Sequence, residues 1–161
     1  MVGAALAAVL GCAACGGSHA QARVVRSHGF SFQAPHGWRT ADRGTTFEVA
    51  APEGPDLLWV TRLRLLRPYR PALWDGVVPE LDRVARSLAA EVSGRVTSSR
   101  TVVVAGRRAR RYEIRFERNG AERVEQIAFV LDGSTEYQLL CRLGSSGGDV
   151  CARFFASFAL A

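Results

Sequence analysis

Alternating apolar and polar positions predict β-strands on both sides of one helical region. The two-residue period of a strand runs through residues 29–35, 45–51 and 57–66, which end near proline or glycine. It returns in residues 101–105, 109–118, 123–131 and 137–143. Asn119-Gly120 and Asp132-Gly133 separate the last three segments and favour tight hairpins, because both dipeptides tolerate positive φ. These three strands are therefore predicted to form an antiparallel meander.

Two segments carry the spacing of amphipathic helices. In the first, apolar residues recur every three or four positions at Leu81, Val84, Ala85, Leu88 and Val92. Asp82 and Arg86 stand four residues apart, which predicts an ion pair on the helix surface. Gly76 and Pro79 predict an interruption between this helix and a helical turn at residues 72–77. Residues 149–159 form the second predicted helix.

The order of strands, helix, strands and helix predicts an α+β fold. A sheet with one apolar face and a helix with one apolar stripe must cover each other, so we expect a twisted antiparallel β-sheet flanked by helices, an α/β/α sandwich. The chain has 161 residues with 48% hydrophobic and 22% charged residues, which is typical of a folded protein. We predict that residues 1–20 are a leader and tether and that residues 21–161 form a single domain.

The N-terminus is predicted to be a signal peptide that ends at a lipidated cysteine. Residues 2–10 are apolar, uncharged and too short to span a bilayer, which takes about 20 residues. Val9-Leu10-Gly11-Cys12 resembles a bacterial lipobox, so Cys12 is the predicted lipidation site, with Cys15 as the alternative. The first three residues lack the positive charge of a signal peptide. An ordinary cleaved signal and an apolar tail on a cytoplasmic protein therefore stay open.

Cys141 and Cys151 flank a turn-like segment rich in glycine and serine. In an oxidising compartment we expect them to form a disulfide, and closing so short a loop stabilises a protein by about 2.7 kcal/mol. Free thiols and a metal pair are the alternatives. A metal site needs further ligands nearby, and His19, His28 and His36 all lie near the N-terminus. The sequence therefore indicates no metal, no cofactor and no catalytic set.

Arginine supplies all 21 basic residues, and the net charge is +6. The densest cluster comprises Arg107, Arg108, Arg110 and Arg111. Guanidinium groups bind phosphate and carboxylate, so this patch could hold an anionic lipid, a glycan or an acidic protein. The alternative is a solvated strand face that pairs with glutamates of the next strand, such as Glu122 and Glu125. Nucleic acid is not expected as a partner, because the leader predicts export.

The large aromatic residues divide between the predicted core and a candidate groove. Trp38 and Trp59 lie in or beside alternating segments and are predicted to be core residues. Tyr69 and Trp74 lie in an irregular segment, residues 68–79, where they could line a groove for an apolar ligand.

With these elements placed, the chain resembles the PsbP-like superfamily, and more narrowly the LpqN-type lipoproteins of actinobacteria. Three segments carry the resemblance: Phe30-Ser31-Phe32 through Pro35-His36-Gly37-Trp38, then Val102 to Gly106 with Ala109 and Tyr112, and finally Phe154-Phe155-Ala156-Ser157-Phe158 after the strand with Tyr137 and Cys141. The resemblance implies a sheet between helices that serves as a binding or accessory scaffold. It supplies no catalytic residues to carry over.

The sequence thus predicts a non-catalytic binding or accessory protein of the bacterial cell envelope. We expect it on the extracytoplasmic face of the cell membrane, held by its N-terminal lipid, with an envelope protein or an anionic lipid or glycan as partner. Two alternatives remain: a small-ligand carrier or enzyme with a pocket near Trp74, and a cytoplasmic chaperone of similar fold.

Overall fold

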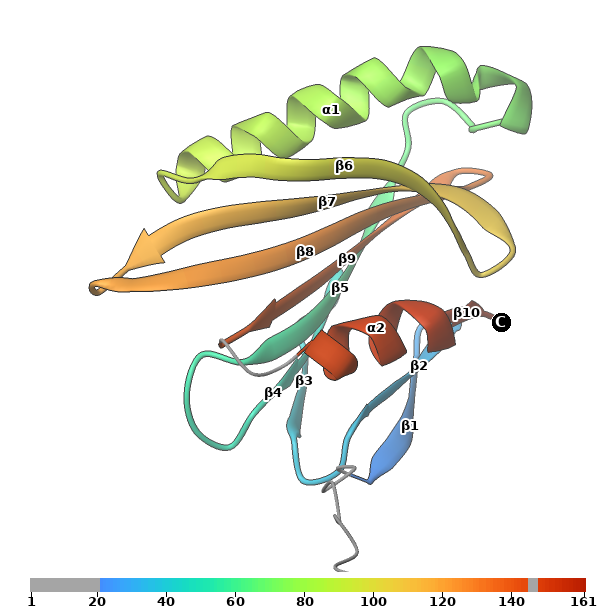
Figure 1. Ribbon diagram of the computed structural model, residues 1–161. Helices are drawn as coiled ribbons and strands as arrows, with labels where there is room; N and C mark the ends of the chain where they lie inside the picture. The colour runs from blue at the N-terminus through green and yellow to red at the C-terminus, as the bar shows by residue number, and fades with distance from the viewer. Residues whose placement is uncertain (1–20, 145–147) are drawn as a thin grey trace, which may run out of the picture.

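Two antiparallel sheets and two helices make up the part of the chain that the computed structural model describes, residues 21–144 and 148–161 (Figure 1). The larger sheet contains, in spatial order, β3 (Arg39–Asp42), β4 (Thr46–Ala50), β5 (Leu57–Arg64), β9 (Thr135–Leu143), β8 (Ala121–Asp132), β7 (Arg107–Arg118) and β6 (Arg95–Val104). The smaller sheet contains β1 (Ala22–Ser27), β2 (Phe30–Pro35) and β10 (Ala159–Leu160). The helices are α1 (Trp74–Glu91), which follows a 3-10 turn at Pro71–Leu73, and α2 (Gly148–Ser157).

The predicted meander is confirmed and extends over four strands, β6 to β9. Each hairpin has a two-residue loop that begins with a residue at positive φ: Ala105 at 51°, Asn119 at 55° and Gly133 at 55°. Such loops match the right-handed twist of the strands that they join. Asp132, which we expected in the turn, is the last residue of β8 and pairs with Thr135.

The face of the large sheet that carries α2 holds the larger core. Leu58, Val60 and Leu139 are completely buried there, and the small sheet and α2 cover them. Phe154 of α2 packs against Phe32 of β2, with 4.9 Å between the ring centroids. Helix α2 and β2 therefore close this side of the molecule together. Trp38 packs partly buried against this core.

Helix α1 covers only half of the opposite face. This is seen in a row of residues that pair across five neighbouring strands, from β7 to β4. The row runs from Tyr112 through Ile127, Leu140 and Trp59 to Glu48. Tyr112 and Ile127 lie beneath α1 and are buried, whereas the last three residues are only half-buried. The expectation that Trp59 is a core residue is therefore wrong, because it points to the side of β5 that no helix covers in the described chain. The fully buried residues of this strand are Leu58 and Val60.

Helix α1 runs without interruption through Pro79, contrary to the break that we predicted. Proline removes one backbone donor in the second turn, and the preceding 3-10 turn starts the helix before that point. Its buried face includes Leu81, Ala85 and Ala89, whereas Val84 is exposed. No helix among the described residues is long and apolar enough to cross a membrane.

Strands β1, β3 and β10 were not predicted; they have six, four and two residues and show little alternation. Strand β6 starts earlier than predicted, directly after Gly94. A Cβ at Gly94 would lie 2.6 Å from the backbone oxygen of Arg115, so this close approach of helix end and strand requires glycine.

Candidate functional site

An apolar groove lies beside α1, at the edge of the part of the sheet that this helix covers. The segment between β5 and α1 forms one wall with Leu65, Tyr69 and Leu73, and α1 forms the other with Val77, Leu81 and Val84. Leu131 and Glu136 of the sheet also line it, and its volume is about 330 Å³. Apolar hollows with few polar groups are the usual ligand sites of proteins. We therefore treat this groove as the candidate functional site.

A second, more polar hollow of about 280 Å³ adjoins the groove. The two share Tyr69 and Leu131, and the second hollow adds Arg107, Arg108 and Asp132. The structure thus brings the candidate groove residue Tyr69 next to the first two residues of the arginine cluster. Their proximity could not be read from the sequence, where they lie about 40 residues apart.

Trp74 does not line the groove, contrary to our expectation. Its side chain is buried at the first residue of α1, and the guanidinium carbon of Arg108 lies 6.0 Å from its ring centroid. Tyr69 is held in place through its backbone, because its N–H donates to the carbonyl oxygen of Gly133 at 2.7 Å.

The arginine cluster does not form one patch, because successive residues of β7 point to opposite faces of the sheet. Arg107 pairs with Asp132, with 2.8 Å between Nε and Oδ1. Arg110 pairs with Asp82 of α1 at 3.1 Å. Arg111 donates to Gln126 and lies 4.2 Å from the ring centroid of Phe155. Within the cluster, only Arg108 lacks a hydrogen bond or carboxylate partner among the described residues.

The prediction that Glu122 and Glu125 pair with this arginine cluster is wrong. The hairpin at Asn119-Gly120 sets the register, which places Glu122 opposite Glu117 and Glu125 opposite Ile114. Glu125 is instead buried and pairs with Arg142 of β9. The register could have been read from the two-residue loop, since it fixes every pair in the two strands.

A polar cluster fastens α1 to the sheet at the edge of the buried face. Asp82 accepts hydrogen bonds from the hydroxyl of Tyr112 at 2.7 Å and from Nε of Arg110 at 3.1 Å. Burial acts to raise the pKa of Asp82, but these two bonds outweigh it and the pKa lies below its ordinary value. Burial and the bond to Asp82 raise the pKa of Tyr112. The predicted partner Arg86 contributes only as a nearby charge, so the expected ion pair is replaced by bonds to β7.

This cluster predicts a stability that depends on pH. A carboxyl whose pKa is lower in the folded state stabilises the fold above its unfolded pKa of about 3.9, and this stabilisation is lost as pH falls through the folded value. Asp82→Asn should therefore lower the free energy of unfolding at pH 7 by about 1–2 kcal/mol. Its loss of stability between pH 5 and pH 2, measured by urea denaturation, should be smaller than that of the wild type.

Asp75→Asn is the matched control, since Asp75 lies in the first turn of the same helix and is exposed. Asp75→Asn should lose as much stability between pH 5 and pH 2 as the wild type does. An equal loss in the wild type and in Asp82→Asn would show that the bonds to Tyr112 and Arg110 do not contribute in solution.

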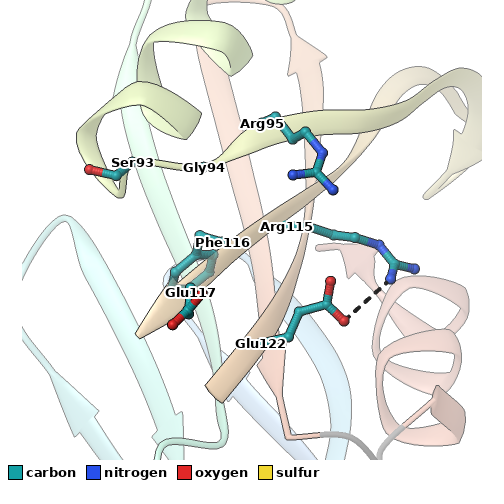
Figure 2. Close-up of a pocket in the computed structure, with 7 residues that line it drawn as sticks. All are labelled: Ser93, Gly94, Arg95, Arg115, Phe116, Glu117 and Glu122. Atoms are coloured by element: carbon teal, nitrogen blue, oxygen red, sulfur yellow. Dashed lines mark ion pairs between the residues drawn. The ribbon is translucent and has the colours of Figure 1, made fainter. Parts of the chain in front are cut away.

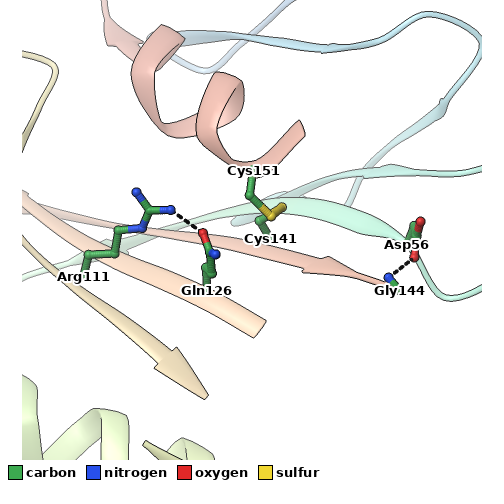
Figure 3. The surroundings of a disulfide bond; sticks show 6 residues. All are labelled: Asp56, Arg111, Gln126, Cys141, Gly144 and Cys151. Atoms are coloured by element: carbon green, nitrogen blue, oxygen red, sulfur yellow. Dashed lines mark hydrogen bonds between the residues drawn. A yellow bond between two sulfur atoms is a disulfide. The ribbon is translucent and has the colours of Figure 1, made fainter. Parts of the chain in front are cut away.

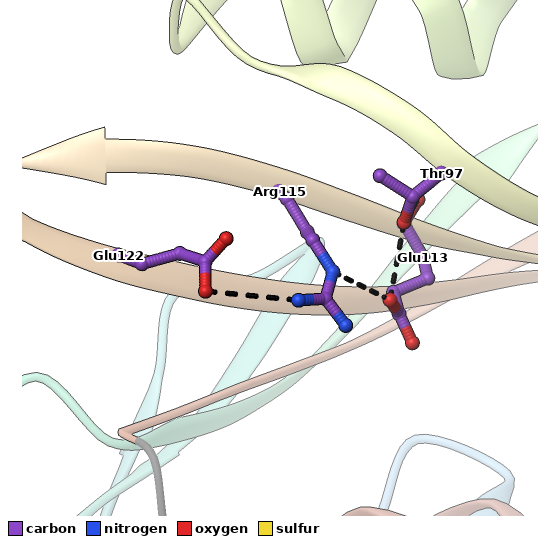
Figure 4. A network of polar contacts seen from close by, with 4 residues as sticks. All are labelled: Thr97, Glu113, Arg115 and Glu122. Carbon is purple, nitrogen blue, oxygen red and sulfur yellow. Dashed lines mark hydrogen bonds and ion pairs between the residues drawn. The ribbon is translucent and has the colours of Figure 1, made fainter.

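A larger hollow of about 380 Å³ lies at the other end of β6, β7 and β8 (Figure 2). Its lining is mostly charged and includes Arg95, Arg115 and Glu122. Arg115 lies between two carboxylates: its Nε is 3.0 Å from Glu113, and its Nη1 is 3.6 Å from Glu122 (Figure 4). Thr97 also donates to Glu113 at 3.1 Å. Arg115 and Glu122 thus lie close to each other, and the hollow is more polar than the groove.

The expected disulfide is present and joins β9 to α2 (Figure 3). The sulfur atoms of Cys141 and Cys151 are 2.03 Å apart, and both residues are buried in the larger core. Beside them, the N–H of Gly144 donates to Asp56 at 2.7 Å and fastens the end of β9. The disulfide is therefore part of the scaffold and lies away from the lining of the groove.

The remaining predicted sites are distributed as follows. Cys12, Cys15 and His19 lie outside the described residues. His28 is exposed and bonds to Asp42 at 2.7 Å, and His36 is exposed on the surface. Within residues 21–144 and 148–161, no group of three His, Cys, Asp or Glu side chains could hold a metal ion.

Comparison with known proteins found similarity at the level of structure alone. No protein-family model matches the sequence, and no curated protein matches it. The solution structure of cyanobacterial PsbP (CyanoP) from Synechocystis sp. PCC 6803 superposes with a TM-score of 0.66 and 15% identity, over 93% of this chain and 99% of that one. LpqN of Mycobacterium tuberculosis, involved in cell envelope biogenesis, superposes with a TM-score of 0.52 and 14% identity, over 89% and 92%.

A protein of Bacteroides thetaiotaomicron VPI-5482 is similar over part of its length. It superposes with a TM-score of 0.60 and 12% identity over 83% of this chain, which spans only 45% of that protein. At these identities the likeness concerns the fold. The order of strands, the helices on both faces and the superposition with CyanoP agree with the predicted α+β class, and the chain has a PsbP-like fold.

Proposed function

We propose that this protein is a membrane-anchored, extracytoplasmic lipoprotein that binds a partner of the cell envelope without catalysing a reaction. The observation that carries the proposal is the apolar groove between α1 and the segment that contains Tyr69. Leu73 and Val84 line it and stay 51% and 40% exposed, although burying such side chains is favourable. Exposed apolar side chains around a hollow are typical of a binding surface.

The envelope location rests on the N-terminal sequence and on one structural relative. Val9-Leu10-Gly11-Cys12 has the pattern of a lipobox, and Cys141 and Cys151 form a disulfide, which suits an oxidising compartment. LpqN, which has the same fold, is involved in cell envelope biogenesis. The proposal extends that setting to this protein.

A binding role without catalysis is supported by the chemistry around the groove. Nucleophilic catalysis needs a nucleophile, a base and an orienting group in contact. The titratable side chains of the groove lining, Arg67, Tyr69, Glu80 and Glu136, include no histidine or cysteine. Glu80 bonds to Arg83, and Glu136 accepts a hydrogen bond from Gln138. These residues suit recognition better than turnover.

A small-ligand carrier is the second candidate, favoured by the size of the groove. Its volume of about 330 Å³ lies at the lower end of the range for small-molecule sites, about 300–1,000 Å³. This candidate shares its binding residues with the first and differs in the occupant.

The groove is tested with 1-anilinonaphthalene-8-sulfonate, an anionic aromatic dye whose fluorescence rises when its rings enter apolar surroundings. Val84→Glu, which places a charge in the wall, should raise the dissociation constant of the dye at least about tenfold. Val103→Glu is the matched control, because Val103 is 72% exposed on β6 and does not line the groove. Equal binding by both variants would refute the groove as the binding site.

The anchor is tested separately by growth with radiolabelled palmitate. The wild type should incorporate the label, and a variant with Cys12→Ser and Cys15→Ser should not. Incorporation that persists in the double variant, or its absence from the wild type, would refute the lipoprotein assignment.

A further inference from the structure

Four of the six exposed large hydrophobic residues in the described chain lie in β5, the segment after it and α1: Leu63, Leu66, Leu73 and Val84, of which Leu73 and Val84 line the groove. Leu66 differs from the other three because its side chain is fully exposed, at 104%. Its chain neighbours Leu65 and Arg67 line the groove, whereas Leu66 itself does not. The groove therefore does not explain the exposure of Leu66, and we consider the charged residues around it.

Unpaired arginines surround this leucine. Arg64, Arg67 and Arg70 are exposed, and none of their guanidinium groups has a hydrogen bond or ion pair with any described residue. Residues 57–74 contain no aspartate or glutamate. The segment from Arg62 to Leu73, which we name the docking segment, thus combines positive charge with exposed apolar surface.

The backbone holds the docking segment firmly against the sheet. The N–H of Leu65 donates to the carbonyl oxygen of Ser134 at 2.9 Å, and the N–H of Tyr69 donates to that of Gly133 at 2.7 Å. Both bonds join the segment to the turn between β8 and β9. Because the chain is fastened on either side of Leu66, the cost of ordering this loop is already met before any partner arrives.

Two acidic groups near the segment bond to other residues, and no nearby carboxylate pairs with the arginines of the segment among the described residues. Glu80 bonds to Arg83 of the same helix, and Glu136 accepts from Nε2 of Gln138 at 2.7 Å. Asp75 is exposed at the start of α1. The three unpaired arginines of the segment therefore remain available to an external anion.

We propose that the docking segment binds an anionic lipid surface and places Leu66 among the lipid chains at the interface. Arginine bonds to lipid phosphates while its stem lies along apolar surface, and tyrosine favours the boundary between water and hydrocarbon. A fluid lipid surface receives a protruding leucine without needing a complementary pocket. This inference goes beyond the proposed function, since it depends neither on the occupant of the groove nor on acylation of Cys12.

The test uses the full chain with Cys12→Ser, Cys15→Ser and Leu66→Cys, labelled at residue 66 with a fluorophore sensitive to polarity. Vesicles of phosphatidylcholine with and without phosphatidylglycerol are added. With phosphatidylglycerol, the emission should shift to shorter wavelength, and lipids that carry a nitroxide should quench it. Arg67→Gln and Arg70→Gln should each weaken binding about fivefold, and 1 M salt should abolish the shift.

The matched control is Val103→Cys in the same background, labelled in the same way. Both variants carry identical residues 1–20, so binding through the N-terminus affects them equally and only the signal at residue 66 reports docking. An unchanged signal at residue 66, or equal signals at residues 66 and 103, would overturn the proposal. So would a shift that needs no anionic lipid, or one that appears without vesicles as protein concentration rises, which would identify a second copy as the partner.

The docking test separates this proposal from the function proposed above. Failure of dye binding with a normal signal at residue 66 would remove the groove and keep the docking segment. The reverse result would keep the groove and remove the docking segment.

Discussion

Phe154→Ala is expected to lower the free energy of unfolding by about 4 kcal/mol. The side chain of Phe154 is completely buried in the core between α2, the small sheet and the large sheet. Its ring contacts those of Phe32 and Phe155, with centroid distances of 4.9 and 5.1 Å. Removing the ring leaves a cavity that these elements cannot close, because the disulfide of Cys151 fixes α2 to β9.

The free energy is measured by urea denaturation followed by circular dichroism. Leu66→Ala is the control, since it also removes a large apolar side chain but from a fully exposed position. It should change stability by less than about 0.5 kcal/mol. A loss for Phe154→Ala no larger than that of the control would mean that α2 does not close the core as described.

Glu125→Ala is expected to cost about 3 kcal/mol. Glu125 is the one charged residue that is buried in the described chain, at 5% exposure, and it pairs with Arg142 on the neighbouring strand. Both lie on the face that α1 covers only in part, at the end near Leu57. Without the carboxylate, the guanidinium of Arg142 stays largely buried with no opposite charge, which is the main source of the loss.

Two variants separate this explanation from a general effect of substitution. Glu122→Ala alters an exposed residue of the same strand, whose side chain is 63% exposed and 3.6 Å from Arg115, and should cost less than about 1 kcal/mol. Glu125→Leu combined with Arg142→Leu removes both charges and should recover most of the stability lost in Glu125→Ala. A double variant less stable than Glu125→Ala would show that the pair itself contributes net stability.

The arginine cluster shows which part of the site was open to prediction. The alternation of β7 and the two-residue loop at Asn119-Gly120 are local features, and together they predict that the cluster divides between two faces and lies opposite residues 128–132. The ion pair of Arg107 with Asp132 follows from that register. The pairing of Arg110 with Asp82 does not, because it depends on how α1 crosses the sheet.

The groove and the docking segment could be predicted only in part. The sequence contains a signal for the segment, namely four arginines and no acidic residue within residues 57–74. The exposure of Val84 carries no such signal, since it occupies an apolar position that the helical periodicity assigns to a buried face. The predictions for Trp59 and Trp74 failed for the same reason. Trp59 was expected in the core and is half-buried, whereas Trp74 was expected in the groove and is buried, because an apolar residue is buried only where a second element covers it.

By itself, the sequence determined the class of fold, the meander from β7 to β9 and the two helices, because each follows from interactions between residues close in the chain. The tertiary structure alone decided how far α1 covers the sheet, which apolar residues stay exposed, and which carboxylate each arginine meets. These properties depend on the packing of elements far apart in the chain. The groove exists because a helix of 18 residues covers only one half of a face seven strands wide.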